Sequence, residues 1–170
     1  MIDRFTLDDA LPTERPASKT LLTIELVPST SWGDNLRSRL TKAQWDKLRR
    51  KCYQMAGYRC EICGDVGLNQ GVNWPVECHE VWHYDDEKHV QKLVRLISLC
   101  PNCHLSKHIG FAQLKGKEDA AYFHMQKVNG WTKAQVLAHI RESFNVWQKR
   151  SEHPWDLDLS VLADYGVSPP

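Results

Sequence analysis

Two C-x-x-C pairs constrain this chain more than any other feature of its sequence. Cys60 pairs with Cys63 and Cys100 with Cys103, and each pair is followed at once by turn-forming residues or by a histidine. This spacing is typical of two knuckles that bind one tetrahedral zinc ion. The pairs are separated by 36 residues, more than a simple zinc ribbon contains, so we expect a further folded element inside the loop.

Disulfides, or two unrelated pairs of buried cysteines, are the alternative interpretations. Disulfide frameworks are typical of small secreted proteins, whereas this chain has 170 residues, 42% of them hydrophobic, and can form an apolar core. The first residues do not resemble a secretory signal, and no apolar run is long enough to span a bilayer. We therefore expect a soluble, cytoplasmic protein without membrane contact, with a structural Zn²⁺ on four cysteines and with Cys52 and Cys78 as packed thiols.

The net charge of +1 conceals an uneven distribution of charge. Residues 36–59 carry eight basic residues against one acid, while residues 151–170 carry four acids and no Lys or Arg. A concentrated positive field attracts a polyanion whatever the total charge. We expect a nucleic acid partner, DNA rather than RNA, with a protein partner left open; the expected nucleic-acid-binding residues are Arg37, Arg39, Lys42, Lys47, Arg49, Arg50, Lys51 and Arg59.

Local patterns predict an α+β fold that is mostly helical. Capping boxes at Thr41 and Thr132 each predict a helix, because the threonine hydroxyl can accept a backbone N–H of the first turn. Trp45, on the first of these helices, is either a core residue or a platform for an unpaired base. Breaker residues and apolar spacing predict the other elements: an extended arm over 1–20, a strand over 21–27, and helices over 42–56, 87–95, 117–128 and 133–150.

Five of the eight histidines lie inside the cysteine loop or just beyond it. His104 and His108 are four residues apart, so on a helix both imidazoles face the same way and can bind one cation. Solvated histidines on a helix surface are the alternative. Asp85 and Asp86 are interpreted as a turn before the helix expected over 87–95.

Two stretches of the chain resemble the HNH endonuclease family in its zinc-knuckle variant. They are ECHEV at residues 77–81 and LISLCPNCHLSKH at residues 96–108. The resemblance covers residues 58–110, under a third of the chain, and implies a small zinc-stapled ββα-metal finger, also called the His-Me finger, flanked by helices. It also implies that His79 on a β-hairpin, with His104 and His108 on a helix, binds a catalytic divalent cation such as Mg²⁺, Mn²⁺, Ni²⁺ or Zn²⁺.

The chain departs from that family at two positions of the catalytic machinery. Glu80 stands where the family has its general-base histidine, and Arg95 stands where it has its middle asparagine. The implied catalytic residues are then His79, Glu80 and Arg95, with Glu80 as the base and with its charge expected close to that of Arg95. His83 is an alternative base. An alignment shifted by one residue is a further alternative, in which Cys78 becomes the ligand and His79 the base.

These patterns divide the chain into three segments and predict one activity. The segments are an N-terminal arm, strand and basic helix over 1–57, the finger over 58–110, and helices with an acidic tail over 111–170. The predicted activity is metal-dependent endonuclease cleavage of phosphodiester bonds. The alternative is a catalytically silent, zinc-stabilised module that binds nucleic acid or protein. Nothing in the sequence has the glycine pattern of a nucleotide-cofactor enzyme.

Overall fold

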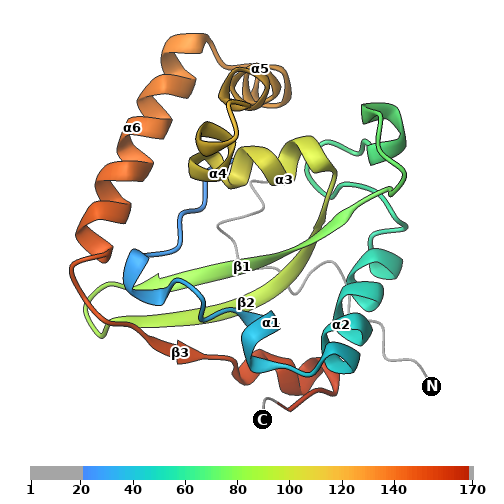
Figure 1. Cartoon of the computed structure of the whole chain (residues 1–170), viewed down its shortest axis with the longest axis vertical. Helices are drawn as coiled ribbons and strands as arrows, with labels where there is room; N and C mark the ends of the chain where they lie inside the picture. The colour runs from blue at the N-terminus through green and yellow to red at the C-terminus, as the bar shows by residue number, and fades with distance from the viewer. Residues whose placement is uncertain (1–20, 169–170) are drawn as a thin grey trace.

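A β-hairpin crosses the middle of the molecule, with helices on both sides of it (Figure 1). The computed structural model describes residues 21–168, so the arm expected over 1–20 lies outside the described residues. Strands β1 (Glu77–Asp85) and β2 (Val90–Leu99) are antiparallel, and β3 (Asp156–Asp158) adds in parallel to the start of β2. β1 is therefore an edge of the sheet, whose order is β1-β2-β3. The predicted α+β, mostly helical class is confirmed.

The helices begin and end where local chemistry favours it. The side chains of Thr41 and Thr132 accept the backbone N–H groups of Gln44 and Gln135, which confirms both capping boxes. The described helices are α1 (Leu36–Arg39), α2 (Lys42–Met55), α3 (Pro101–Lys107), α4 (Ile109–Leu114), α5 (Glu118–Asn129) and α6 (Lys133–Arg150), with short 3-10 helices at Ser29–Ser31, Gly67–Gln70 and Ser160–Tyr165. None of the described helices is long and apolar enough to cross a membrane.

The prediction of a helix over 87–95 is wrong, because strand β2 begins at Val90. Asp85 does form the expected turn, because its Oδ1 accepts the backbone N–H groups of Glu87 and Lys88. The turn leads into β2 rather than into a helix, and His89 completes it with a left-handed φ of 52°. Pairing with β1 decides the conformation here, since the apolar residues of this stretch fit a strand as well as a helix. The hairpin is the element folded inside the cysteine loop.

The prediction of a strand over 21–27 is also wrong. This segment is extended but joins no sheet, because other groups satisfy its backbone. The N–H groups of Leu22 and Ile24 donate to the side chains of Asn129 and His139, and that of Glu25 donates to the carbonyl of Lys107. The segment is therefore fixed against α3, α5 and α6.

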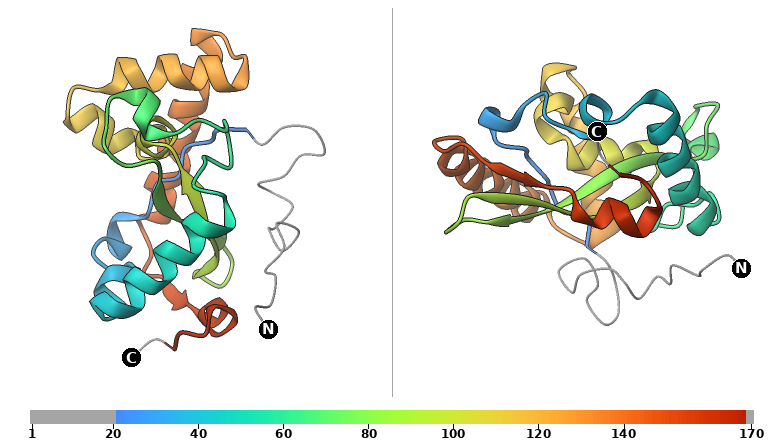
Figure 2. Two further views of the ribbon diagram at one scale, coloured as in Figure 1. Left: turned by 90° about the vertical axis from the view of Figure 1, so that its right-hand side faces the viewer. Right: turned by 90° about the horizontal axis from the view of Figure 1, so that it is seen from below.

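Two apolar cores hold the hairpin from opposite faces. Val81, Ile97 and Leu99 pack with the 22–26 segment and α3–α6 in the first core. Leu93 and Leu96 face the second core, which α1, α2 and the residues after β3 complete. Figure 2 shows this C-terminal segment running along the hairpin beside α2. Both cores include residues from all three sequence segments, and together they hold the hairpin from both faces.

Candidate metal centre

The four knuckle cysteines converge around one point, as their spacing predicts. Their sulfur atoms all lie within 4.8 Å of one another, and Cys63 Sγ is 3.5 Å from Cys100 Sγ and 3.6 Å from Cys103 Sγ. Tetrahedral zinc with bonds of about 2.3 Å separates its sulfur ligands by about 3.8 Å, whereas a disulfide needs about 2.05 Å. All six cysteines are free thiols. The four-cysteine group is therefore spaced to hold one metal ion.

Hydrogen bonds join the thiols of this cluster to one another and to a nearby histidine. The bonds among the thiols lower the pKa of Cys100 far below its ordinary value and raise that of Cys103 far above it. From α5, the Nε2 atom of His124 lies 3.1 Å from Cys103 Sγ and can donate to a thiolate there. Sequence reasoning missed His124, because it comes 21 residues after Cys103 with no spacing that marks it.

The other two cysteines pack together in the second core. Cys52 is buried and Cys78 is half-buried, as expected of packed thiols. A hydrogen bond from Cys52, together with burial, raises the pKa of Cys78 well above its ordinary value. A protonated thiol is a poor metal ligand. His79 rather than Cys78 joins His104 and His108, so the shifted alignment, with Cys78 as a ligand, has no geometric support.

Arg95 ties the first knuckle to the hairpin. Its Nη1 atom donates to Glu61 Oε2 at 2.9 Å, and Glu61 Oε1 accepts the backbone N–H of Ser98 at 2.8 Å. Glu61 lies between Cys60 and Cys63, so this ion pair fixes the knuckle against β2. Glu80 is instead hydrogen-bonded to the backbone N–H of Leu36 at 3.2 Å. Arg95, whose charge was expected close to that of Glu80, thus has a structural role at the knuckle.

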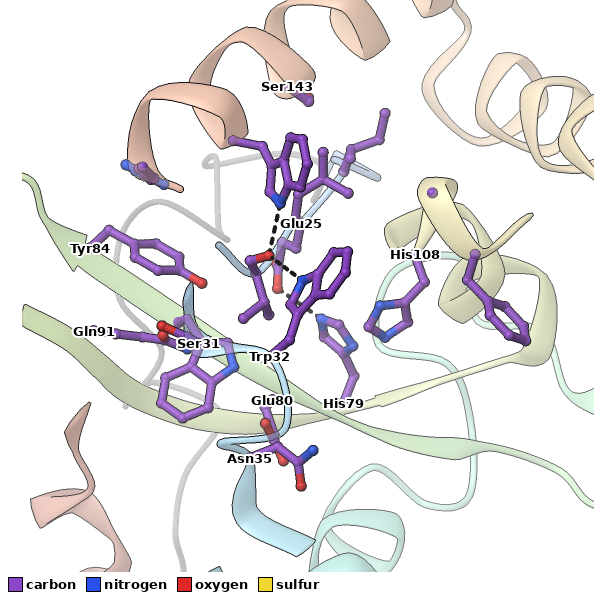
Figure 3. A pocket seen from close by; sticks show the side chains of 18 of the residues that line it. Glu25, Ser31, Trp32, Asn35, His79, Glu80, Tyr84, Gln91, His108 and Ser143 are labelled. Carbon is purple, nitrogen blue, oxygen red and sulfur yellow. Dashed lines mark hydrogen bonds and ion pairs between the residues drawn. The ribbon is translucent and has the colours of Figure 1, made fainter. Parts of the chain in front are cut away.

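Three histidines form a second cluster, and they are the three that the family resemblance implies. His79 comes from β1, His104 from α3, and His108 caps that helix one turn later. One ligand nitrogen from each lies within 4.8 Å of the others, and the Nε2 atoms of His104 and His108 are 3.2 Å apart. Figure 3 shows His79 and His108 turned toward each other. The hairpin and helix therefore bring three imidazoles to one point.

Carboxylates fix the orientation of two of these imidazoles. Glu77 accepts a hydrogen bond from His104 Nδ1, which lowers the pKa of Glu77 and leaves His104 Nε2 facing the cluster. Glu25 Oε2 lies 2.7 Å from His79 Nε2 and fixes the orientation of that ring. Burial, reinforced by the charges of His79 and His104, lowers the pKa of His108 to about 3. Carboxylate partners of this kind commonly orient histidines that bind metal ions.

Glu25 is the residue of this cluster that the sequence did not reveal. Its other oxygen, Oε1, accepts from Lys107 Nζ at 2.6 Å, and Lys107 is fully buried. A buried ammonium without a carboxylate partner is costly, so this ion pair holds the Glu25 side chain in place. Glu25 lies 54 residues before His79, in a segment whose pattern indicated only a strand. No local signal marks it.

The three histidines line part of a cleft of about 1150 Å³, which runs along the edge strand β1. His79 and Glu80 both line it, but they leave β1 in different directions, with Glu80 toward Asn35 (Figure 3). Burial raises the pKa of Glu80. The Leu36 N–H group, the Arg37 charge and the Trp82 side chain offset only part of this rise. His83 is exposed on β1, four positions after His79, which corresponds to about 13 Å along the strand. Of the candidate bases, Glu80 is nearer to the histidines.

The basic residues lie on α1, on α2 and just after it, but acids offset part of their charge. Arg39 pairs with Asp34, while Lys42 and Arg49 share Asp46. The Lys47 ammonium donates to the carbonyl of Gly166 in the C-terminal segment. Arg37 lies over the ring of the half-buried Trp45, 5.2 Å from its centroid, and both line the cleft. The remaining members of the set are Arg50, Lys51 and Arg59, of which Lys51 is half-buried against Tyr165.

Comparison with known proteins supplies no further identification. No known family matches the chain, and neither the curated proteins nor the solved structures contain a significant match to it.

Proposed function

We propose that the chain is a metal-dependent nuclease that hydrolyses phosphodiester bonds, in DNA rather than RNA. The observation that carries the proposal is the three-histidine cluster, formed by β1 and α3 at the edge of a cleft and beside a four-cysteine group. We also propose that the ion at the four cysteines is Zn²⁺, since an all-sulfur tetrahedral set favours it. This zinc fixes the start of α3 against the hairpin, and hence His104 against His79.

The residues of the cluster have separable tasks. A divalent cation held by His79, His104 and His108 supplies polarisation of the scissile phosphate and stabilisation of the leaving oxygen. Glu77 and Glu25 keep the ligand nitrogens of His104 and His79 directed into the cluster. Arg37, exposed on α1 and lining the same cleft, is placed to contact a neighbouring phosphate of the substrate strand.

Glu80 is proposed as the general base. A carboxylate whose pKa is raised by burial accepts a proton more readily at neutral pH than an ordinary one does. The Leu36 N–H group binds one of its oxygens and orients the side chain. The activated water would lie at the open edge of β1, where Glu80 and His79 meet the cleft.

A cleavage assay on the wild-type chain tests the proposal. Plasmid and single-stranded DNA, with RNA in parallel, are incubated with Mg²⁺, Mn²⁺ or Ni²⁺ at constant zinc loading. We expect cleavage that depends on the added ion, and anomalous density between the three histidines in a crystal soaked with Mn²⁺. No cleavage of any substrate with any ion would refute the nuclease.

Replacing Glu80 with glutamine is expected to lower the cleavage rate about 10²- to 10⁴-fold, the range supplied by a positioned proton acceptor. Ion binding should be retained, because the three imidazoles are untouched. Glu142→Gln is the matched control, since Glu142 is an exposed carboxylate that lines the same cleft. Full activity in Glu80→Gln, with loss of activity in His83→Ala, would assign the role of base to His83.

A silent binding module is the second candidate, and one observation favours it. The Leu36 N–H group and the Trp82 side chain already hydrogen-bond to the Glu80 carboxylate, which leaves fewer of its lone pairs for an attacking water. In that case the chain binds nucleic acid through its basic residues, and the cleavage assay gives no product with any ion. The same assay therefore separates the two candidates.

A further inference from the structure

Gln91 is a buried polar side chain at one end of the cleft. It is 1% exposed, and neither its amide nitrogen nor its amide oxygen has a hydrogen-bond partner among the described residues. It nevertheless lines the cleft, directly across the hairpin from Tyr84. An unpaired buried amide costs folding free energy, whereas an apolar residue of the same size would not. The amide lies just beneath the wall of the cleft, so a ligand that displaces the covering side chains meets a donor and an adjacent acceptor.

Aromatic rings surround the cleft and are held in place. Trp32 is 68% exposed, yet its ring stacks on Trp147 with centroids 6.2 Å apart. The indole N–H groups of both tryptophans donate to the carbonyl of Val27 at 3.0 Å, which fixes the pair. A large ring that is rigid but exposed gains little from folding and is preorganised to stack on a planar ligand. The other aromatic side chains that line the cleft are Trp45, Trp82, Tyr84, Phe111 and Phe144.

Resting on the proposed nucleolytic function, we propose that this cleft receives an unpaired nucleobase and that the substrate is single-stranded or locally unpaired nucleic acid. The Watson–Crick edge of every base presents a hydrogen-bond donor beside an acceptor, which is the complement of a glutamine amide. That edge is occupied in a duplex and becomes available only when the base is unpaired. Stacking on aromatic side chains tolerates any base.

The base site and the metal site are separate parts of one cleft. Figure 3 shows Gln91 and Tyr84 away from His79 and His108. Tyr84 is five positions after His79, which corresponds to about 17 Å along β1. A nucleotide whose base contacts Gln91 is therefore not the one whose phosphate is cleaved. Gln91 serves to select and position the strand.

Binding of oligonucleotides to the full chain, without added divalent ion and with zinc retained, tests this inference. Four fluorescent probes share one length: single-stranded DNA, single-stranded RNA, duplex DNA, and a strand of abasic residues that keeps every phosphate. We expect wild type to bind the single strands about tenfold more tightly than the duplex or the abasic strand. In Gln91→Leu this preference should fall to about threefold or less.

Thermal unfolding distinguishes a ligand-binding Gln91 from a structural one. Because its amide is unpaired, Gln91→Leu should raise the melting temperature by about 2–4 °C while weakening the binding of bases. A fall in melting temperature would instead give Gln91 a structural role and overturn the inference. Gln148→Leu, at an exposed position of α6 outside the cleft, should change neither quantity.

Trp32 is tested with a control of equal exposure. Trp32→Ala should weaken single-strand binding about tenfold and Trp32→Phe only slightly, because phenylalanine keeps a stacking face. Phe123→Ala, at a ring 69% exposed on α5 and outside the cleft, should have no effect.

The outcomes separate this inference from the nuclease. Binding that prefers single strands and depends on Gln91, without any cleavage, would retain the base site and refute the nuclease. Cleavage of duplex DNA at the wild-type rate by Gln91→Leu would retain the nuclease and overturn the base site. Equal affinity for abasic and base-bearing strands would overturn it as well. If the chain binds no nucleic acid at all, the base site is overturned as well, and a protein becomes the expected occupant of the cleft.

Discussion

Replacing His104 with alanine is expected to remove the divalent ion and to abolish cleavage while leaving the zinc bound. His104 supplies one of three imidazoles, and its Nε2 atom is 3.2 Å from that of His108. Two remaining histidines hold a cation far more weakly. The lost stabilisation of the developing charge amounts to several kcal/mol, or about a thousandfold or more in rate. Calorimetric titration with Mn²⁺ and the plasmid assay measure the two losses separately.

The design of this experiment separates a ligand from a structural residue. His153→Ala is the control, because His153 is exposed and stacks on His89 outside both metal clusters. It should retain ion binding and cleavage. Zinc content and the melting temperature of His104→Ala should remain close to wild type, since the four sulfur atoms are unchanged. A His104→Ala variant that cleaves at the wild-type rate would contradict a three-histidine ion site.

Most members of the two candidate metal clusters could be predicted from the sequence because their spacing is local. A C-x-x-C pair forms a knuckle almost independently of its surroundings, and His104 and His108 share a helix face wherever that helix lies. His79 required more than spacing, since only the resemblance of the ECHEV stretch placed it beside them. The capping boxes at Thr41 and Thr132 were predictable for the same local reason.

The residues that support the ligands could not be predicted, because tertiary packing alone brings them there. Glu25 reaches His79 only because the 21–27 segment is bound to α3, α5 and α6 instead of joining the sheet. His124 reaches Cys103 through the packing of α5 on α3. The wrong helix over 87–95 has a related origin, since its apolar residues suit either conformation and pairing with β1 decides between them.

The partner of Arg95 illustrates how charge alone misleads. Arg95 and Glu80 have opposite charges and lie on neighbouring strands, but Arg95 binds Glu61 in the first knuckle. The side chains of Arg95 and Glu61 are about one-tenth exposed, at 10% and 12%, so removing either would leave a buried charge. Arg95 therefore holds β2 against the first knuckle through Glu61.

Replacing Cys103 with serine is expected to remove the zinc and with it much of the stability of the fold. Cys103 lies in the first turn of α3 and is fully buried in the first core. Zinc binding contributes directly to folding free energy, because the site does not exist in the unfolded chain. A loss of about 5 kcal/mol would lower the melting temperature by about 10–20 °C in a chain of this size. Elemental analysis and thermal unfolding measure both effects.

The control is Cys78→Ser, since Cys78 is a free thiol outside the four-cysteine group and should keep one equivalent of zinc. If Cys103→Ser does not fold, the thermal unfolding of wild type is measured with and without a zinc chelator, which gives the same comparison. Because α3 carries both Cys103 and His104, partial loss of zinc should also weaken Mn²⁺ binding at the histidines. Unchanged zinc content and an unchanged melting temperature in Cys103→Ser would refute the four-cysteine site. Lost zinc with undiminished Mn²⁺ affinity would instead show that the two cores alone position the histidines.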